Sequence, residues 1–377
     1  MDMIVTEDQQ ALAALAKEIL TDRVTPAALS ALETATPGGV WDPETWKALA
    51  AAGIVGAALP EAHGGGGLGL VELGLILEEV GRAAAPLPFV ATVAIGALAV
   101  ARHGTAAQQA ALLPGVCDGS TVLTAALVEP GETDPQAPTT NVTRDSDGLK
   151  LWGTKVLVPY GAEATCVLVP AAVDSGVAVF LVDPNAPGVT VTPVVVTSRE
   201  PTASLELNGV HINDADVLGG VTGAAGRDVV ADIVQVGTAA LASVQAGLCD
   251  GALKLTSSYT RERKQFGVAI GSFQAVGQRE ADAFIDTEVV RLTARQAQWR
   301  LAEGLPAEDE VAIAKYWAAD GGGRVVHAAH HLHGGIGMDL EYPLFRYFIA
   351  TRQIEHTLGS PTRQLLTLGA SLAEQPV

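Results

Sequence analysis

The sequence predicts an α+β fold in three parts, because the spacing of its apolar residues changes twice along the chain. Residues 1 to about 120, and again residues 223 to 377, show the spacing of amphipathic helices. Between them, residues 121 to 222 are rich in Val, Thr, Gly and Pro, and short runs alternate apolar with polar side chains as half-buried strands do. Helices, then a compact β unit, then long helices are typical of an α+β arrangement.

The N-terminal part contains three predicted helices. Thr6 is placed to cap the first, whose pattern has broken by Pro37. The second begins at Asp42-Pro43, where the aspartate caps and the proline takes the first helical position. The third covers residues 70 to 82.

The central and C-terminal parts are read from the same signals. Residues 177–182 and 189–196 are predicted strands, and Asn208-Gly209 is predicted to be a two-residue hairpin turn. An Ala-rich helix is expected over residues 227–260. Another is expected over 310–331, weakened by three consecutive glycines at 321–323.

Composition narrows the classes of function. The chain has 377 residues, 48% of them hydrophobic, and a net charge of -19. This charge disfavours nucleic acid and anionic lipid as partners, and an anionic substrate would need locally concentrated basic groups. No apolar stretch is expected to reach the ~18 residues of a membrane span. The acidic N-terminus does not resemble a secretory signal, and three widely spaced cysteines are expected to be reduced thiols, so a cytoplasmic location is predicted.

Two C-terminal motifs have chemistry that suits a diphosphate-bearing cofactor. Arg263-Lys264-Gln265-Phe266-Gly267 offers a forked guanidinium donor and an aromatic ring, although alone it reads as a solvated helix end. Gly334-Gly335 suits a helix end where backbone approaches a ligand. The histidines before it have helical spacing, and a zinc or iron site is one alternative, but no carboxylate pattern accompanies them, so no metal is expected. They are His327, His330, His331 and His333.

Taken in order, these motifs resemble the acyl-CoA dehydrogenase family over essentially the whole chain. The most specific are the Arg263 motif and the run His331-Leu332-His333-Gly334-Gly335. Supporting segments are Leu59 to Gly69, Glu78 to Arg82, Glu129-Pro130-Gly131, Ser198 to Thr202 and Glu341 to Leu344. The His-Leu-His-Gly-Gly form looks most like actinobacterial members acting on bulky or steroid-derived CoA esters.

The resemblance implies an N-terminal helical domain (1–120), a central β domain built as a small barrel or sandwich (121–222) and a C-terminal four-helix bundle (223–377). It also implies FAD, an acyl-CoA substrate and an electron-transferring flavoprotein as acceptor. A glutamate would remove the α proton while the β hydrogen passes to the flavin. Arg263, Gln265 and Phe266 with His331, Gly334 and Gly335 would contact the FAD of a neighbouring subunit at its diphosphate and adenosine end.

The expected catalytic base is missing from both of the family's usual positions. Counting from Tyr342-Pro343 places Leu358 at the first, and counting back from Arg263 places Gly237 at the second. Glu355, about one helical turn before Leu358 and so on a similar face, is the nearest candidate for a relocated base. It reads equally well as a solvated helix residue.

Three further replacements fall where the resemblance puts flavin-facing groups. Val128 replaces a threonine, Leu157 an aromatic residue, and Pro159 a second hydroxyl donor. The groups that reach a neighbour's FAD are retained, so the sequence favours a base-less partner subunit in a heterotetramer of homologous chains. The alternatives are a self-sufficient dehydrogenase using Glu355, and a structural member of the fold that lacks FAD.

Overall fold

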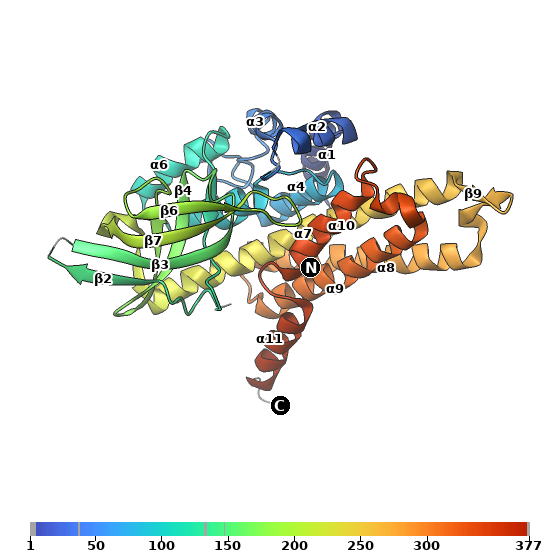
Figure 1. Ribbon diagram of the computed structural model, residues 1–377. Coiled ribbons are helices and arrows are strands. Elements are labelled where there is room, and N and C mark those ends of the chain that lie inside the picture. Colours follow the sequence, from blue (N-terminus) through green and yellow to red (C-terminus); the bar gives the residue numbers. More distant parts are fainter. Residues whose placement is uncertain (1–4, 37, 132–133, 147, 375–377) are drawn as a thin grey trace. The chain divides into compact units, whose positions relative to one another are not determined.

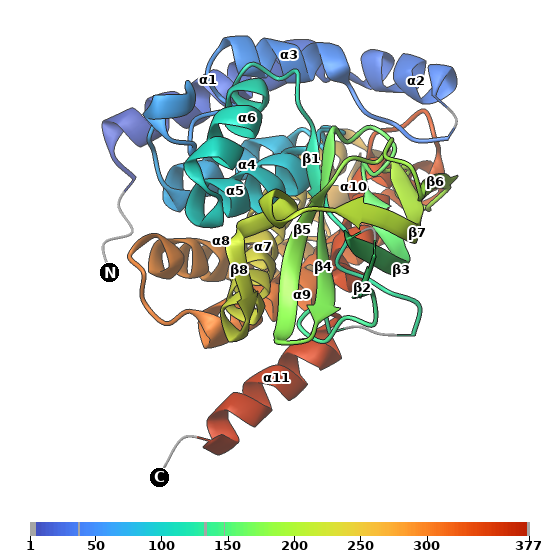
Figure 2. The same cartoon turned by 90° about the vertical axis from the view of Figure 1, so that its left-hand side faces the viewer.

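The computed structural model describes residues 5–36, 38–131, 134–146 and 148–374, which form two compact units (Figure 1, Figure 2). The first comprises Met1–Ala31, Leu70–Ala85 and Thr238–Val377, and the second Leu32–Gly69 and Pro86–Gly237. N-terminal helices, a central mixed sheet and a C-terminal helical bundle confirm the predicted fold class. The division at residues 120 and 222 stays a prediction.

The first unit is helical, and its centre is lined with small side chains. Its helices are α1 (Glu7–Arg23), the start of α2 (Pro26–Ala35), α4 (Leu70–Arg82), α7 (Ala224–Glu262) from Thr238 on, α8 (Gln274–Ala302), α9 (Glu308–His333), α10 (Leu344–His356) and α11 (Pro361–Glu374). Buried alanines such as Ala242, Ala294 and Ala314 let α7, α8 and α9 approach closely. Gly322 serves the same purpose, because a Cβ there would lie 2.5 Å from Gln245 Nε2. Only α11 extends away from the other helices of this unit (Figure 1, Figure 2).

A buried ionic network joins α4 to α7 and α8 within this unit. Glu78, 6% exposed, accepts from Arg82 of its own helix and from Arg291 and Arg295 of α8. Asp250 of α7 pairs with both Arg82 and Arg291. Glu78, Asp250, Arg82 and Arg291 each have several partners, whereas Arg295 pairs with Glu78. The network therefore supplies the compensation that burial of charged groups requires.

The second unit is built on one mixed sheet. Its strands are β1 (Leu123–Ala125), β2 (Asn141–Asp145), β3 (Gly148–Pro159), β4 (Cys166–Val173), β5 (Gly176–Val182), β6 (Val189–Val194), β7 (Thr202–Ile212) and β8 (Val217–Gly223). The order is β6-β7-β3-β2-β4-β5-β8, with β1 parallel to β4. The helices of this unit are α3 (Pro43–Ala51), a π-helical segment (Phe89–Ala97), α5 (Leu98–His103), α6 (Ala106–Cys117) and the first part of α7.

Several predicted elements are confirmed. Thr6 caps α1, Asp42 caps α3 with Pro43 in its first turn, and α7 extends the predicted Ala-rich helix at both ends. α9 runs unbroken through the glycines at 321–323. The three cysteines are buried free thiols, as expected.

Other predictions differ from the structure. The first helical pattern is two helices, since Pro26 begins α2 after a break at 24–25; Pro37 lies outside the described residues. Asn208-Gly209 is a bulge inside β7, because Gly209 at φ +68° shifts the register against β3 without reversing the chain.

One helix has the length and composition of a membrane span, contrary to the sequence-based expectation. This is α7, but 72% of its apolar window is buried inside the protein. It is therefore a core helix, and its apolar side chains pack against other helices.

Candidate functional site

Arg263 stands where α7 ends and a tight hairpin begins. The strands β9 (Lys264–Gln265) and β10 (Val268–Ala269) pair around Phe266 and Gly267, which both have positive φ (+52° and +83°), as in a type I′ turn. A left-handed conformation costs an aromatic residue roughly 1–2 kcal/mol. Phe266 is nevertheless 93% exposed. Its ring packs edge-to-face against Phe273, with ring centroids 6.2 Å apart. An exposed, strained aromatic side chain at a hairpin tip is available for contact with another molecule.

The Arg263 guanidinium is exposed, while the backbone around it is fixed. The backbone N–H of Arg263 donates to Tyr259 O (2.8 Å), and its backbone carbonyl accepts from Ile270 N (2.8 Å). Among the described residues, no carboxylate forms a salt bridge with Arg263. The Gln265 side chain donates to Lys264 O (2.9 Å). Arg263 can therefore give its forked donors to an external anion.

The end of α9 brings the predicted glycines to the surface of the same unit. Gly334 has φ +64° and ψ -139°, a conformation that favours glycine, and a Cβ on either Gly334 or Gly335 would meet nothing within 4 Å. His331 is exposed, and its Nδ1 accepts from Arg279 of α8. Tyr259, one turn before Arg263, stacks on His333 with ring centroids 4.4 Å apart, which brings the two motifs together.

The side chains of the four histidines of α9 do not point toward a common metal-binding position. His327 and His330 both contact the ring of Phe348, and His330 Nδ1 donates to Val326 O (3.1 Å). Burial lowers the pKa of His330 and of His333. Over the described residues, no group of three or more His, Cys, Asp or Glu side chains is arranged to hold a metal ion.

Leu358 lies in the turn between α10 and α11, in the left-handed region at φ +54°. Its aliphatic side chain cannot accept a proton. Buried Lys315 of α9 fixes this turn by donating to the carbonyls of Ile354 (2.9 Å), Glu355 (3.3 Å) and Gly359 (2.8 Å). The other expected base position, Gly237, is a buried residue inside α7.

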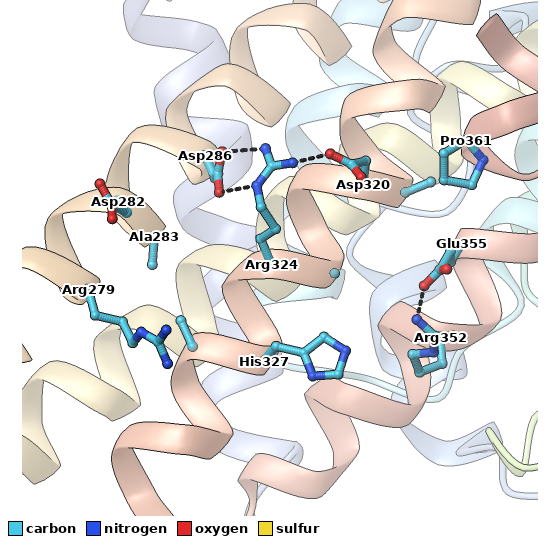
Figure 3. A pocket seen from close by; sticks show the side chains of 13 residues that line it. Arg279, Asp282, Ala283, Asp286, Asp320, Arg324, His327, Arg352, Glu355 and Pro361 are labelled. Carbon is cyan, nitrogen blue, oxygen red and sulfur yellow. Dashed lines mark hydrogen bonds and ion pairs between the residues drawn. The ribbon is translucent and has the colours of Figure 1, made fainter.

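Glu355 faces a charged pocket of about 460 Å³ between α8, α9 and α10 (Figure 3). Its carboxylate pairs with Arg352, and Arg324 in the same pocket is held by Asp286 and Asp320. The expectation that Glu355 shares a face with Leu358 assumed a continuous helix. α10 ends at His356, so Leu358 lies beyond it, in the turn before α11.

In the second unit, Leu157 and Pro159 lie on β3, and Val128 pairs with the same strand. Val156 N donates to Val128 O (2.9 Å), and the register of β3 against β7 slips between Lys155 and Val158. The slip places Leu157 at φ +52° with 54% of its surface exposed. All three side chains lack the hydroxyl and aromatic groups that the family resemblance places here.

A buried ion pair directly beneath these residues was not found by sequence reasoning. Lys155 Nζ donates to Glu129 Oε1 (2.6 Å) and to Pro170 O (2.8 Å), and Glu129 also accepts from the backbone N–H groups of Thr139 and Thr140. Burial opposes ionisation of Glu129, but Lys155 and the two threonines outweigh it and lower its pKa to about 2. The sequence feature that could have indicated this ion pair is Lys155, a lysine within a strand whose other residues are largely apolar.

The described residues fit FAD on one surface and not on the other. The Arg263 hairpin and the Gly334-Gly335 turn offer a free cation, an exposed ring and open backbone, which suit a diphosphate and an aromatic base. Val128, Leu157 and Pro159 offer no side-chain hydrogen-bond donor to a flavin ring.

Comparison with known proteins agrees with the sequence motifs. Residues 6–120 match the model of the acyl-CoA dehydrogenase N-terminal domain, and residues 224–373 match that of the C-terminal domain. The chain is 40% identical to the acyl-CoA dehydrogenase FadE27 of Mycobacterium tuberculosis over the whole length of both.

Two solved structures are similar over nearly the whole chain. The ChsE4-ChsE5 complex from Mycobacterium tuberculosis contains a chain with a TM-score of 0.93 and 39% identity, with full coverage of both chains. A variant of the Tcur3481-Tcur3483 steroid ACAD contains one with a TM-score of 0.90 and 43% identity, covering 98% of this chain and 99% of that one. The chain therefore belongs to the acyl-CoA dehydrogenase family.

Proposed function

We propose that this chain is the base-less partner subunit of a heteromeric, FAD-dependent acyl-CoA dehydrogenase. The observation that carries the proposal is Leu358. It occupies the family's base position, in a turn that Lys315 holds through three backbone carbonyls. The second known base position, Gly237, is a buried glycine of α7. A homologous subunit would supply the glutamate.

The uneven distribution of cofactor-facing groups supports the same proposal. Arg263, Phe266, Gly334 and Gly335 are all exposed, and Phe266 packs only edge-on against Phe273 among the described aromatic side chains. We assign them to the diphosphate and adenosine end of FAD held mainly by the partner, with Gln265 and His331 beside them. FAD, when bound, would supply the acceptor for the hydride that leaves the β carbon of the substrate. This chain's part is to bind and orient that cofactor.

The relatives support a proposal for the substrate class and the assembly. One similar structure is a variant of a steroid ACAD, and another is the ChsE4-ChsE5 complex. We therefore propose a bulky or steroid-derived acyl-CoA as substrate, a heterotetramer as the assembly, and an electron-transferring flavoprotein as the electron acceptor. A location in the cytoplasm agrees with three buried reduced thiols.

Two other functions remain to be separated from this one. A self-sufficient dehydrogenase would use Glu355 as base. However, the Glu355 carboxylate already pairs with Arg352, and the Glu355 backbone carbonyl accepts from Lys315. A member of the fold without FAD would have no use for an exposed, strained Phe266, or for an exposed Arg263 that no described carboxylate pairs with. We favour the partner subunit over both.

Arg263→Ala tests the proposal in the complex co-expressed with a homologous, glutamate-bearing subunit. Loss of a charge-assisted contact to a diphosphate costs about 1.5–3 kcal/mol, so flavin retained on gel filtration should fall at least tenfold, with unchanged melting of the chain. Arg261→Ala is the matched control, because Arg261 is also exposed and, among the described residues, its side chain donates to Ser257. Equal flavin content in both variants would make Arg263 an ordinary solvated helix end.

A further inference from the structure

His333 is the last residue of α9, and it is buried although Gly334, directly after it, is exposed. Only 4% of its surface is accessible. Its ring lies parallel to Tyr259 of α7 (4.4 Å, 20°) and tilted against Tyr342, which precedes α10 (5.3 Å, 54°). His333 therefore contacts the ends of two other elements at the point where α9 turns.

The hydrogen bonds of His333 define its tautomer. Nδ1 lies 2.8 Å from Ala329 O, and a carbonyl oxygen only accepts, so Nδ1 carries the hydrogen. Nε2 lies 3.0 Å from the Tyr342 hydroxyl and accepts from it. Burial raises the pKa of Tyr342, which keeps that hydroxyl protonated as a donor, and lowers the pKa of His333, which keeps the ring neutral. Both ring nitrogens of neutral His333 thus have a hydrogen-bond partner.

Through Tyr259, His333 is connected to the Arg263 hairpin. The Tyr259 carbonyl accepts from Arg263 N (2.8 Å), while its hydroxyl donates to His333 O (3.4 Å). On its other side His333 is bonded covalently to Gly334, whose positive φ begins the glycine turn. A chain of short contacts thus runs from Arg263 through Tyr259 and His333 to Tyr342.

We propose that His333 is a positioning residue that holds the Arg263 hairpin and the Gly334-Gly335 turn together as one preformed surface for the diphosphate end of the cofactor. The inference rests on the proposed function, which places the cofactor against those two segments. His333 itself is buried and does not touch the ligand. It acts by keeping two segments that are about seventy residues apart in sequence at a fixed spacing, so that binding does not have to order them.

Four variants separate this role from simple packing. His333→Phe keeps a planar ring against Tyr259 but removes both hydrogen bonds, and Tyr342→Phe removes only the bond to Nε2. Tyr259→Phe keeps the stacking and removes the bond to the His333 carbonyl. His327→Phe is the matched control, because His327 lies on the same helix, is exposed, and its ring contacts only Phe348 among the described aromatic side chains.

The first measurement is titration of FAD into the deflavinated co-expressed complex at about pH 8 and then at successively lower pH below about 6.5, the ordinary histidine pKa. His333→Phe should weaken binding roughly tenfold at about pH 8 and Tyr342→Phe by a smaller factor, with His327→Phe unchanged. Because burial lowers the pKa of His333, wild-type binding should weaken only below that ordinary value, when a proton on Nε2 replaces the bond accepted from Tyr342. His333→Phe should show no such loss of binding. The other titratable groups nearby, His330, Tyr259, Tyr342 and Glu262, are retained in that variant.

The second measurement is hydrogen exchange of the chain purified without its partner. His333→Phe should speed exchange together in residues 259–270 and 334–342, and should leave the sheet unchanged. If exchange in both segments is unaltered, the inference is overturned, whatever the complex binds. If the coupled exchange is seen but the wild-type complex binds no FAD, the proposed function fails while the coupling stands.

Discussion

Lys155 and Lys315 are almost wholly buried, at 1% and 0% exposure, and each is compensated in a different way. Lys155 pairs with a carboxylate, Glu129, whereas Lys315 donates only to backbone carbonyls. Removing one member of a buried pair leaves an uncompensated charge and typically costs about 3–5 kcal/mol. The ion pair of Lys155 and Glu129 therefore stabilises the β unit close in sequence to Leu157 and Val128.

Glu129→Gln should change how the free energy of unfolding depends on pH in the acidic range. The pKa of Glu129 falls from its ordinary 4.5 to about 2 in the folded chain. The folded state therefore resists protonation, and stability present above about pH 4.5 is lost as the pH falls toward 2, by roughly 3 kcal/mol. Urea unfolding of the variant between about pH 5 and pH 3 should lack most of this loss. Glu206→Gln, an exposed substitution on β7, is the control; equal acid slopes in the two variants would contradict the assignment.

Glu355→Gln should leave turnover of the assembled complex nearly unchanged, because under the proposal a glutamate of the partner would take the proton. The Arg352 pair it breaks is partly exposed and contributes about 0–1 kcal/mol to stability. If Glu355 were the base, the same change would lower kcat by about a hundredfold or more, since general-base catalysis typically contributes 10²–10⁴. A stopped-flow measurement of flavin bleaching, with melting as a control, distinguishes the two outcomes.

At the level of elements, helices with local signals were predicted and features set by long-range packing were not. Asp42 followed by Pro43 specifies the start of α3 by itself, since cap and first-turn residue are adjacent. The same kind of local reading failed at Asn208-Gly209, where pairing of β7 with β3 continues through the glycine. It also missed the Phe266-Gly267 turn, because an aromatic residue with positive φ carries no sequence signal.

The candidate site divides in the same way. Arg263, Phe266, Gly334 and Gly335 were found because they form contiguous motifs. The contacts that hold them, from Tyr259 and Tyr342 to His333, come from three separate elements and appear only once the chain is folded. The buried lysines were missed for the same reason.

Lys315→Met should loosen the turn before α11. The variant loses two hydrogen bonds to the end of α10 and one to Gly359 in the turn, so hydrogen exchange in residues 357–374 should accelerate. The chain should lose about 2–4 kcal/mol of stability at neutral pH. Lys47→Met, which removes a highly exposed lysine of α3, should change stability by less than about 0.5 kcal/mol. Unchanged exchange in α11 would show that Lys315 does not control the turn.

The pH dependence of stability provides a second test of the role of Lys315 in the same variant. Burial lowers the pKa of Lys315 from 10.5 to about 8. Between these values the unfolded chain binds the proton and the folded chain does not, so wild-type stability should gain a rising component from about pH 8 toward 10.5. Lys315→Met should lack that component in urea unfolding at successive pH values.

At the scale of the whole molecule, the proposed heteromer divides the cofactor site between two homologous chains. This chain carries a net charge of -19. Under the proposal, the partner would provide the base and the contacts to the flavin ring. The Arg263 hairpin and the Gly334-Gly335 turn of this chain would complete the partner's cofactor site.

The most direct test is the flavin count of the chain alone and in complex with its glutamate-bearing homologue, measured from the flavin absorbance and the protein concentration. The account predicts weak or substoichiometric flavin in the isolated chain. In the complex it predicts tightly held flavin that matches the number of partner chains and not the total. A stoichiometric, tightly held flavin together with acyl-CoA oxidation by the isolated chain would contradict it.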